Sequence, residues 1–207
     1  MLKIIIDELK SHIPFTAVGA VSGIIVILII IWTNSLSQIS QISYAIFYIL
    51  HPGHIILSAM VTTAIYKRYA KKNIGVILLV GYLGAIVVAT LSDSLIPYLQ
   101  EVILDLPNRS AHIGFIEEWW IVNPAALFGV ALGYWKPFTK FPHSGHVLIS
   151  TWASLFHIIM ALGATVNWVV LVATFFFLFL GVWLPCCLSD IIFPLLLTGK
   201  NLPHSHK

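Results

Sequence analysis

The stretch HPGHIILSAMVT at residues 51–62 recurs as HSGHVLISTWAS at residues 143–154. Each copy contains the pattern His-x-Gly-His, followed by an apolar run with a serine at the eighth position, Ser58 in one copy and Ser150 in the other. Self-similarity within a chain is typical of folds that are built from repeated units. The recurring stretch therefore predicts that the chain contains a duplicated unit.

Two further pairs of segments recur in the same order. LSDSLIPYL at 91–99 matches LSDIIFPLL at 188–196 in five of nine positions. Residues 7–23 share a glutamate, a proline and two glycines with residues 117–133. One such match is weak evidence, because apolar segments use few residue types. Three ordered matches favour two copies of a unit of about 90 residues.

The composition excludes a soluble domain. Hydrophobic residues make up 59% of the 207 residues and charged residues 9%, and the mean hydropathy is +0.96. A soluble chain of this length has no interior large enough to bury so many apolar side chains. We therefore expect a polytopic membrane protein. Six apolar stretches have about the length that a transmembrane helix needs, namely 13–32, 53–69, 74–99, 121–136, 145–163 and 168–197.

Lysine and arginine residues predict the orientation of these spans. With a cytoplasmic N-terminus, ten of the eleven Lys and Arg residues lie on the cytoplasmic side, and only Arg109 lies outside. Both termini are then cytoplasmic, in the plasma (inner) membrane, and the net charge of +3 reflects this bias and gives no argument for nucleic acid. Three spans per copy make the second copy cross the bilayer in the opposite direction.

The predicted fold class is an all-α membrane protein in which six transmembrane helices form two inverted three-helix repeats. The first repeat covers residues 1–100, an external loop covers 101–116, the second repeat covers 117–200, and a tail covers 201–207. This three-plus-three plan is similar to that of the lysine-exporter superfamily and related small cation transporters. The similarity is confined to architecture and transfers no residue roles.

Glycines four residues apart predict where helices approach closely. Gly19 and Gly23 lie in the first span, and Gly129 and Gly133 lie in the fourth. Small residues at this spacing let helix backbones touch in a bilayer. We therefore expect spans one and four to pack against each other, or against a second copy of the chain in a homodimer.

Prolines predict helix ends. Pro52 fits the first turn of a helix, so span two is expected to begin there, after a short interfacial helix within residues 34–50. This start places His51 and His54 at the external mouth of span two. A break is also expected near Pro185 in the long sixth span.

Histidine and acidic residues form two predicted groups, one at each membrane face. The candidate metal ligands are His51, His54, Asp93 and Glu118 on the external side, and His143, His146 and Asp190 on the cytoplasmic side. Imidazole and carboxylate groups are usual ligands of Zn²⁺, Mn²⁺, Fe²⁺, Co²⁺ and Ni²⁺. Asp at the centre of a span costs about 2.5 to 3.5 kcal/mol, so a carboxylate there favours a function.

Structural roles remain open for the same residues. The histidine pairs also fit helix capping or contact with interfacial water and lipid phosphate. Asp93 and Asp190 each precede a proline and fit the N-cap of a half-helix. Glu118 fits a helix start, where the helix dipole favours a negative charge. His157 has no counterpart in the first copy and is expected to be a polar group satisfied within the bundle.

The pattern as a whole predicts a small secondary transporter of a divalent transition-metal cation, with half-sites at the two membrane faces and protons exchanged at His and carboxylate groups. Inverted repeats favour transport because exchanging the conformations of two antiparallel halves alternates access to a site. Two alternatives remain open: a metal-dependent intramembrane enzyme, and a membrane partner subunit that transports nothing. No protease, hydrolase or nucleotide-binding motif is present in the sequence. The vicinal Cys186 and Cys187 fit either a ligand for a soft ion or small apolar residues, and both readings stay open.

Overall fold

The computed structural model describes residues 2–69, 73–136, 140–163, 166–187 and 193, without the side chains of residues 2–5, 7, 8, 11, 69 and 140–144. Every regular element in these ranges is helical, which confirms the predicted all-α class. The elements are α1 (Leu2–Trp32), α2 (Leu36–Tyr69), α3 (Ile74–Thr90), the π-helix η1 (Leu91–Leu95), α4 (Ile96–Ile103), α5 (Gly114–Glu117), α6 (Trp119–Trp135), α7 (Lys140–Ala161) and α8 (Trp168–Cys187).

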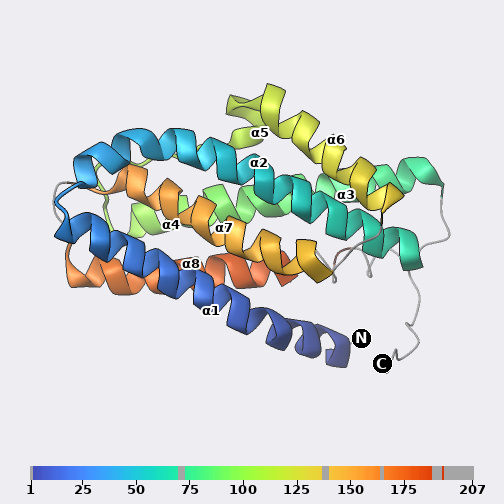
Figure 1. Ribbon diagram of the computed structural model, residues 1–207, viewed down its shortest axis with the longest axis horizontal. Helices are drawn as coiled ribbons and strands as arrows, with labels where there is room; N and C mark the ends of the chain where they lie inside the picture. The colour runs from blue at the N-terminus through green and yellow to red at the C-terminus, as the bar shows by residue number, and fades with distance from the viewer. Residues whose placement is uncertain (1, 70–72, 137–139, 164–165, 188–192, 194–207) are drawn as a thin grey trace.

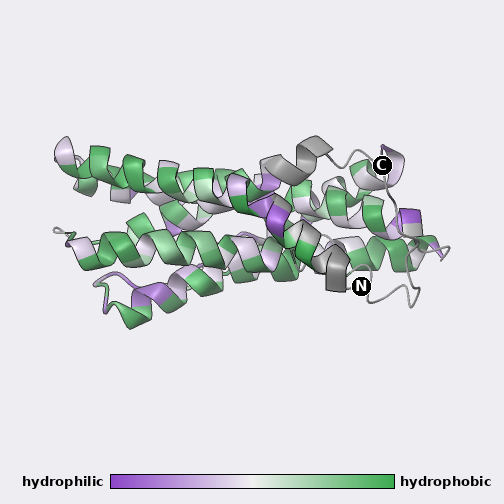
Figure 2. Ribbon diagram, turned by 90° about the horizontal axis from the view of Figure 1, so that it is seen from below, coloured by the Kyte–Doolittle hydropathy of each residue, from purple (hydrophilic) through white to green (hydrophobic). Residues whose placement is uncertain are grey.

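Four helical stretches in the described part are long and apolar enough to cross a membrane. They are His12–Trp32, Leu36–Arg68, Ile74–Ile103 and Trp168–Cys187. Hydrophobic residues predominate along these helices (Figure 2). The chain is therefore an integral membrane protein. Helices α6 and α7 stand where two more spans are predicted, but α6 and the described part of α7, Gly145–Ala161, are shorter than these four stretches, so a count of six stays a prediction.

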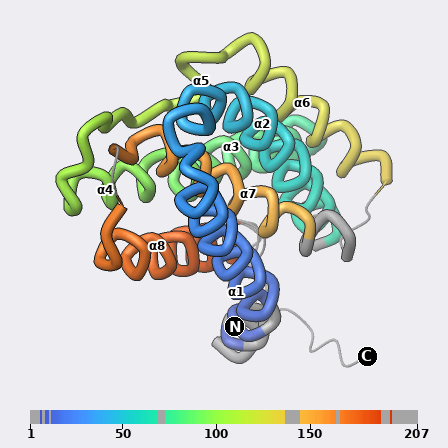
Figure 3. The backbone as a smooth tube through the Cα atoms, turned by 60° about the vertical axis from the view of Figure 1, so that its left-hand side comes forward, coloured from blue at the N-terminus to red at the C-terminus, as the bar shows by residue number. Residues whose placement is uncertain are grey.

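Two central helices organise the bundle. Helices α2 and α7 pack against each other along their length and run in opposite directions (Figure 1). Helices α3 and α6 pack on α2, whereas α1 and α8 pack on α7 (Figure 3). The two helices that carry the His-x-Gly-His pattern are thus the ones that lie at the centre.

Helix α2 begins much earlier than the sequence predicts. It starts at Leu36 and continues through Pro52, so the separate interfacial helix expected within residues 34–50 is wrong. Phe47 and Tyr48 are buried in the main core, and this packing holds the segment before Pro52 in the bundle. Neighbouring helices can satisfy the backbone group that a proline leaves unpaired within a membrane. Helix α8 likewise runs through Pro185, with no break before its described end.

The helix faces that carry the paired glycines, Gly19 and Gly23 on α1 and Gly129 and Gly133 on α6, pack against other helices of the same chain. A Cβ added at Gly129 or Gly133 would meet the backbone of α2, at Ile56 and Met60 respectively. The glycines of the first span pack on α7 and α8 instead of on α6. The expected contact between spans one and four is therefore wrong, and these faces are not available for a homodimer. At Gly129 and Gly133 the missing side chain lets two helix backbones touch, whereas at Gly19 and Gly23 it makes room for side chains of α7 and α8.

We expect Gly133→Ala to destabilise the protein, because the new methyl group has only the rigid backbone of α2 to displace. Overpacking of this kind costs about 1 to 3 kcal/mol. Thermal unfolding of the purified chain in detergent should show a lower midpoint than the wild type. Gly75→Ala is the matched control, since its Cβ would lie 3.8 Å from Asn73 Oδ1 and meet nothing closer. Equal midpoints for the two variants would contradict the close α2–α6 contact.

Candidate functional site

The regular helix pattern is interrupted at Asp93. Residues Leu91–Leu95 form the π-helix η1, in which the N–H of Ile96 bonds to the carbonyl of Leu91 instead of that of Ser92. The next residue, Pro97, has no N–H to donate to the carbonyl of Asp93, four residues earlier. Insertions of this kind occur frequently at functional sites. The interruption leaves two carbonyl groups available to side chains of other helices.

Helix α7 supplies the missing donors. Ser154 donates from Oγ to Ser92 O at 2.9 Å, and His157 Nδ1 lies 2.7 Å from Asp93 O. Both side chains are buried. The irregular backbone is therefore held by α7 and remains within the membrane bundle without an unsatisfied carbonyl at these two residues.

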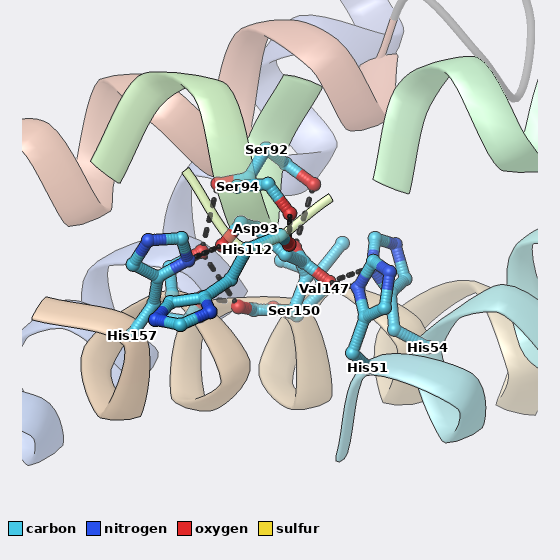
Figure 4. A network of polar contacts seen from close by, with 11 residues as sticks. His51, His54, Ser92, Asp93, Ser94, His112, Val147, Ser150 and His157 are labelled. Carbon is cyan, nitrogen blue, oxygen red and sulfur yellow. Dashed lines mark hydrogen bonds and ion pairs between the residues drawn. The ribbon is translucent and has the colours of Figure 1, made fainter. Parts of the chain in front are cut away.

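The Asp93 carboxylate is the centre of a buried hydrogen-bond network (Figure 4). His51 Nδ1 and His54 Nδ1 lie 2.9 and 2.7 Å from Oδ2. Ser92 and Ser150 donate to Oδ1 at 2.7 and 2.6 Å. The Asp93 side chain is 0% exposed, so these four bonds replace its hydration. Its two oxygens are occupied by protein donors.

These bonds distinguish the two roles considered for Asp93. Helix α4, which follows the π-helix, has Leu95 at its N-cap and no side-chain cap. The carboxylate of Asp93 instead joins α2, η1 and α7, so capping does not account for it. Carboxylates also commonly hold the ring N–H of metal-binding histidines, and the position of Asp93 beside two imidazoles is compatible with that role.

Each of the two histidines keeps one ring nitrogen away from the carboxylate. His51 Nε2 and His54 Nε2 are buried and have no hydrogen-bond partner among the described residues. The ring of His51 stacks on Phe47 with centroids 5.0 Å apart. A Cβ at Gly114 would lie 2.8 Å from His51 Nε2, so the short helix α5 reaches this ring only because residue 114 has no side chain.

The two repeat motifs meet at the centre of the bundle. The rings of His54 and His146 stack with centroids 5.8 Å apart and planes at 11°, and His12 approaches His146 edge-on at 6.4 Å. The expectation that His54 and His146 lie at opposite membrane faces is therefore wrong. Because α2 begins at Leu36, His54 lies in the middle of that helix instead of at its mouth.

A second polar cluster adjoins the first on the side of α4. His157 Nε2 lies 2.8 Å from Ser110 O and 3.3 Å from Glu101 Oε1, and Ser110 N donates to Glu101 Oε2 at 3.1 Å. Glu101 and His157 are buried. Sequence reasoning did not identify Glu101. The regular spacing of Ser150, Ser154 and His157 on one helix face was the available signal for His157.

Glu118 does not join either cluster. It stands at the N-cap position of α6 and accepts a hydrogen bond from Tyr44 at 3.1 Å, which agrees with a position at a helix start. Its neighbour Glu117 accepts from Tyr48 at 2.7 Å and lies 3.2 Å from His112 Nδ1. Burial raises the pKa of Glu117, but the bonds from Tyr48 and His112 lower it by more than burial raises it. The pKa of Glu117 therefore lies below that of an ordinary glutamate.

The remaining candidates are only partly placed. Asp190 and the side chain of His143 lie outside the described residues. Cys186 and Cys187 are buried near the end of α8. Within the described part of the chain, no three His, Cys, Asp or Glu side chains already gather around one metal position.

Comparison with known proteins gives no guide to function. No protein-family model matches the chain, and no curated protein or solved structure is significantly similar to it.

Proposed function

We propose that this protein is a secondary transporter for a divalent transition-metal cation, with one central site between its two halves. The observation that carries the proposal is the arrangement around Asp93. One buried carboxylate holds His51 and His54 through Nδ1 and leaves both Nε2 atoms without partners among the described residues, while His146 stacks on His54. Neutral imidazoles oriented in this way are strong ligands for such cations.

The ring positions fit an ion after a small movement. Two imidazoles that bind one tetrahedral ion through Nε2 have centroids roughly 5 Å apart, given metal–nitrogen distances of about 2.0 to 2.1 Å. The centroids of His54 and His146 are 5.8 Å apart. The rings must turn out of their stack to share an ion, which explains why three ligands are not gathered here. Asp93 has no role as a ligand in this proposal, because its oxygens are occupied.

Equivalent contacts support an inverted repeat. Aligning the two motifs pairs Ala59 with Thr151, and aligning the first and fourth spans pairs Gly19 with Gly129. A Cβ at Gly19 would meet Thr151, and a Cβ at Gly129 would meet Ala59, so equivalent residues make equivalent contacts. The stack of His54 on its own equivalent, His146, favours a pseudo-twofold axis close to these rings. Transport sites commonly lie at such repeat interfaces near the bilayer midplane.

The proposed topology has six spans with both termini cytoplasmic, in a plasma or inner membrane. Lys67 and Arg68 at the end of α2 and Lys136 after α6 lie at one end of the bundle (Figure 1). The loop that contains Arg109 lies at the other end, where Asn108 N bonds to Ala161 O at the end of α7. This separation agrees with the rule that positive residues remain inside.

Metal binding to the purified chain tests the proposal. We expect Zn²⁺, Mn²⁺, Co²⁺ or Ni²⁺, each titrated alone in a calorimeter, to bind the wild type. His54→Ala and His146→Ala should each weaken the affinity at least about 10-fold, since each removes a ligand. His206→Ala, in the C-terminal tail, is the matched control and should bind as the wild type does. Wild-type affinity in both central variants would overturn the central site.

Flux measurements separate transport from the other two functions. Proteoliposomes that contain the wild-type chain should accumulate the metal that binds, and those with His54→Ala should not. An intramembrane enzyme would bind metal without moving it, and a partner subunit would do neither. Binding without flux would therefore contradict the transporter and favour the enzyme.

A further inference from the structure

Both ring nitrogens of His157 face acceptors. Nδ1 lies 2.7 Å from Asp93 O, and Nε2 lies 2.8 Å from Ser110 O with Glu101 Oε1 at 3.3 Å. A backbone carbonyl can only accept a hydrogen bond, and a neutral imidazole has a single N–H. Only the doubly protonated ring can donate to both carbonyls. The geometry of this fully buried histidine therefore fits a bound proton, with Glu101 as the neighbouring negative charge.

Glu101 is itself equipped to take a proton. Its side chain is 1% exposed, Oε2 accepts from Ser110 N at 3.1 Å, and Oε1 has no aligned hydrogen-bond donor among the described residues. A proton that leaves His157 Nε2 therefore has an acceptor 3.3 Å away. The pair can hold one proton in two ways, as imidazolium and carboxylate or as imidazole and carboxylic acid.

A partly exposed histidine, His112, lies beside this pair. The His112 ring lies edge-on to His157, with centroids 5.3 Å apart, and its side chain is 19% exposed (Figure 4). His112 Nδ1 lies 3.2 Å from Glu117 Oε2, which belongs to a side chain that is 39% exposed. The groups that face His157 are Glu101 on α4, Asp93 on η1, His112 before α5, and the Phe47 ring and His51 on α2.

We propose that Glu101 and His157 form a proton-binding site, loaded through His112 and Glu117, that exchanges protons against the transported cation. Proton binding at this pair stands on its own geometry, and only the exchange rests on the proposed function. When the proton moves from His157 Nε2 to Glu101, Ser110 O loses its donor, whereas Nδ1 stays 2.7 Å from Asp93 O. His157 thereby connects the proton-binding pair to the backbone that carries the Asp93 network.

Infrared spectroscopy tests proton binding without any metal. The reconstituted wild type should show a C=O stretching band of a protonated carboxyl group that titrates with pH. We expect one component of this band to be missing in Glu101→Gln and retained in Glu118→Gln, which removes a partly exposed carboxylate outside the pair. A spectrum of Glu101→Gln that equals the wild-type spectrum at every pH would overturn the proposal.

Zinc accumulation tests the exchange. In proteoliposomes that contain the wild type, a gradient of one pH unit should concentrate Zn²⁺ up to about tenfold for each proton exchanged. Glu101→Gln should abolish this accumulation and keep Zn²⁺ affinity at the wild-type level, because Glu101 is not a cation ligand. His157→Gln should also abolish the accumulation. Gradient-driven accumulation in both variants would overturn the exchange. A titrating band in a wild type that moves no Zn²⁺ would support the proton site and contradict transport.

Discussion

Asp93→Asn is expected to reduce Zn²⁺ flux about 10- to 100-fold, the usual effect of losing a group that orients metal-binding histidines. The carboxylate accepts two hydrogen bonds on each oxygen, from His51 and His54 on one and from Ser92 and Ser150 on the other. Asparagine keeps one carbonyl oxygen for the imidazole N–H groups, and the hydroxyls of Ser92 and Ser150 can turn to accept from its NH₂ group. The negative charge is lost, however, and hydrogen bonds to a neutral acceptor are weaker than those to a carboxylate, so the two imidazoles are held less firmly.

Labelled Zn²⁺ uptake into proteoliposomes, normalised to reconstituted protein, measures this effect. A capping role makes the opposite forecast, because Asn and Asp cap helices about equally well. Asp105→Asn is the matched control, since Asp105 is 86% exposed and pairs with Arg109 in a loop. Wild-type uptake by Asp93→Asn would contradict the central site.

Asp190→Asn, which replaces the equivalent residue of the second copy, should lower uptake similarly if the repeat extends to function.

Cysteines at positions 54 and 146 are expected to be joined almost completely by a short bifunctional thiol reagent. The rings now at these positions are 5.8 Å apart, so His54→Cys and His146→Cys bring two thiols within reach of one reagent. Cys186→Ala and Cys187→Ala remove the native thiols from the background. A protease site inserted in the loop between α4 and α5 makes the link visible, because cross-linked halves migrate together after cleavage.

Distance alone should decide the outcome of this cross-link. Pairing His54→Cys with Trp168→Cys is the control, because Trp168 begins α8 at one end of the bundle, whereas His54 lies in the middle of α2. We expect no link for that pair. Failure of the 54–146 pair to link would restore the arrangement with histidine groups at two membrane faces and would remove the central site.

The sequence alone determined the class of the protein. Helices occupy all the predicted spans that the structure describes, because hydrophobicity and residue spacing act locally and a membrane admits few other folds. It also singled out His51, His54, Asp93 and His146, which the structure brings together. A charged or polar group inside a span is costly and therefore stands out from its surroundings in any apolar sequence.

Only the tertiary structure decided where these residues lie. Pro52 reads as a helix start, but burial of Phe47 and Tyr48 by other helices extends α2 to Leu36 and moves His54 from the mouth to the centre. The π-helix at Asp93 depends on Ser154 of α7 in the same way. These features are set by contacts between segments far apart in the chain, and local residue patterns do not contain that information.

The contact between Glu101 and His157 is a second feature that local residue patterns do not predict. Glu101 reads as an ordinary residue at the end of a span, and His157 has no counterpart in the other copy. The sequence determined that both are polar groups in an apolar chain. The fold decided that they meet beside Asp93, because α4 and α7 cross there and exclude water.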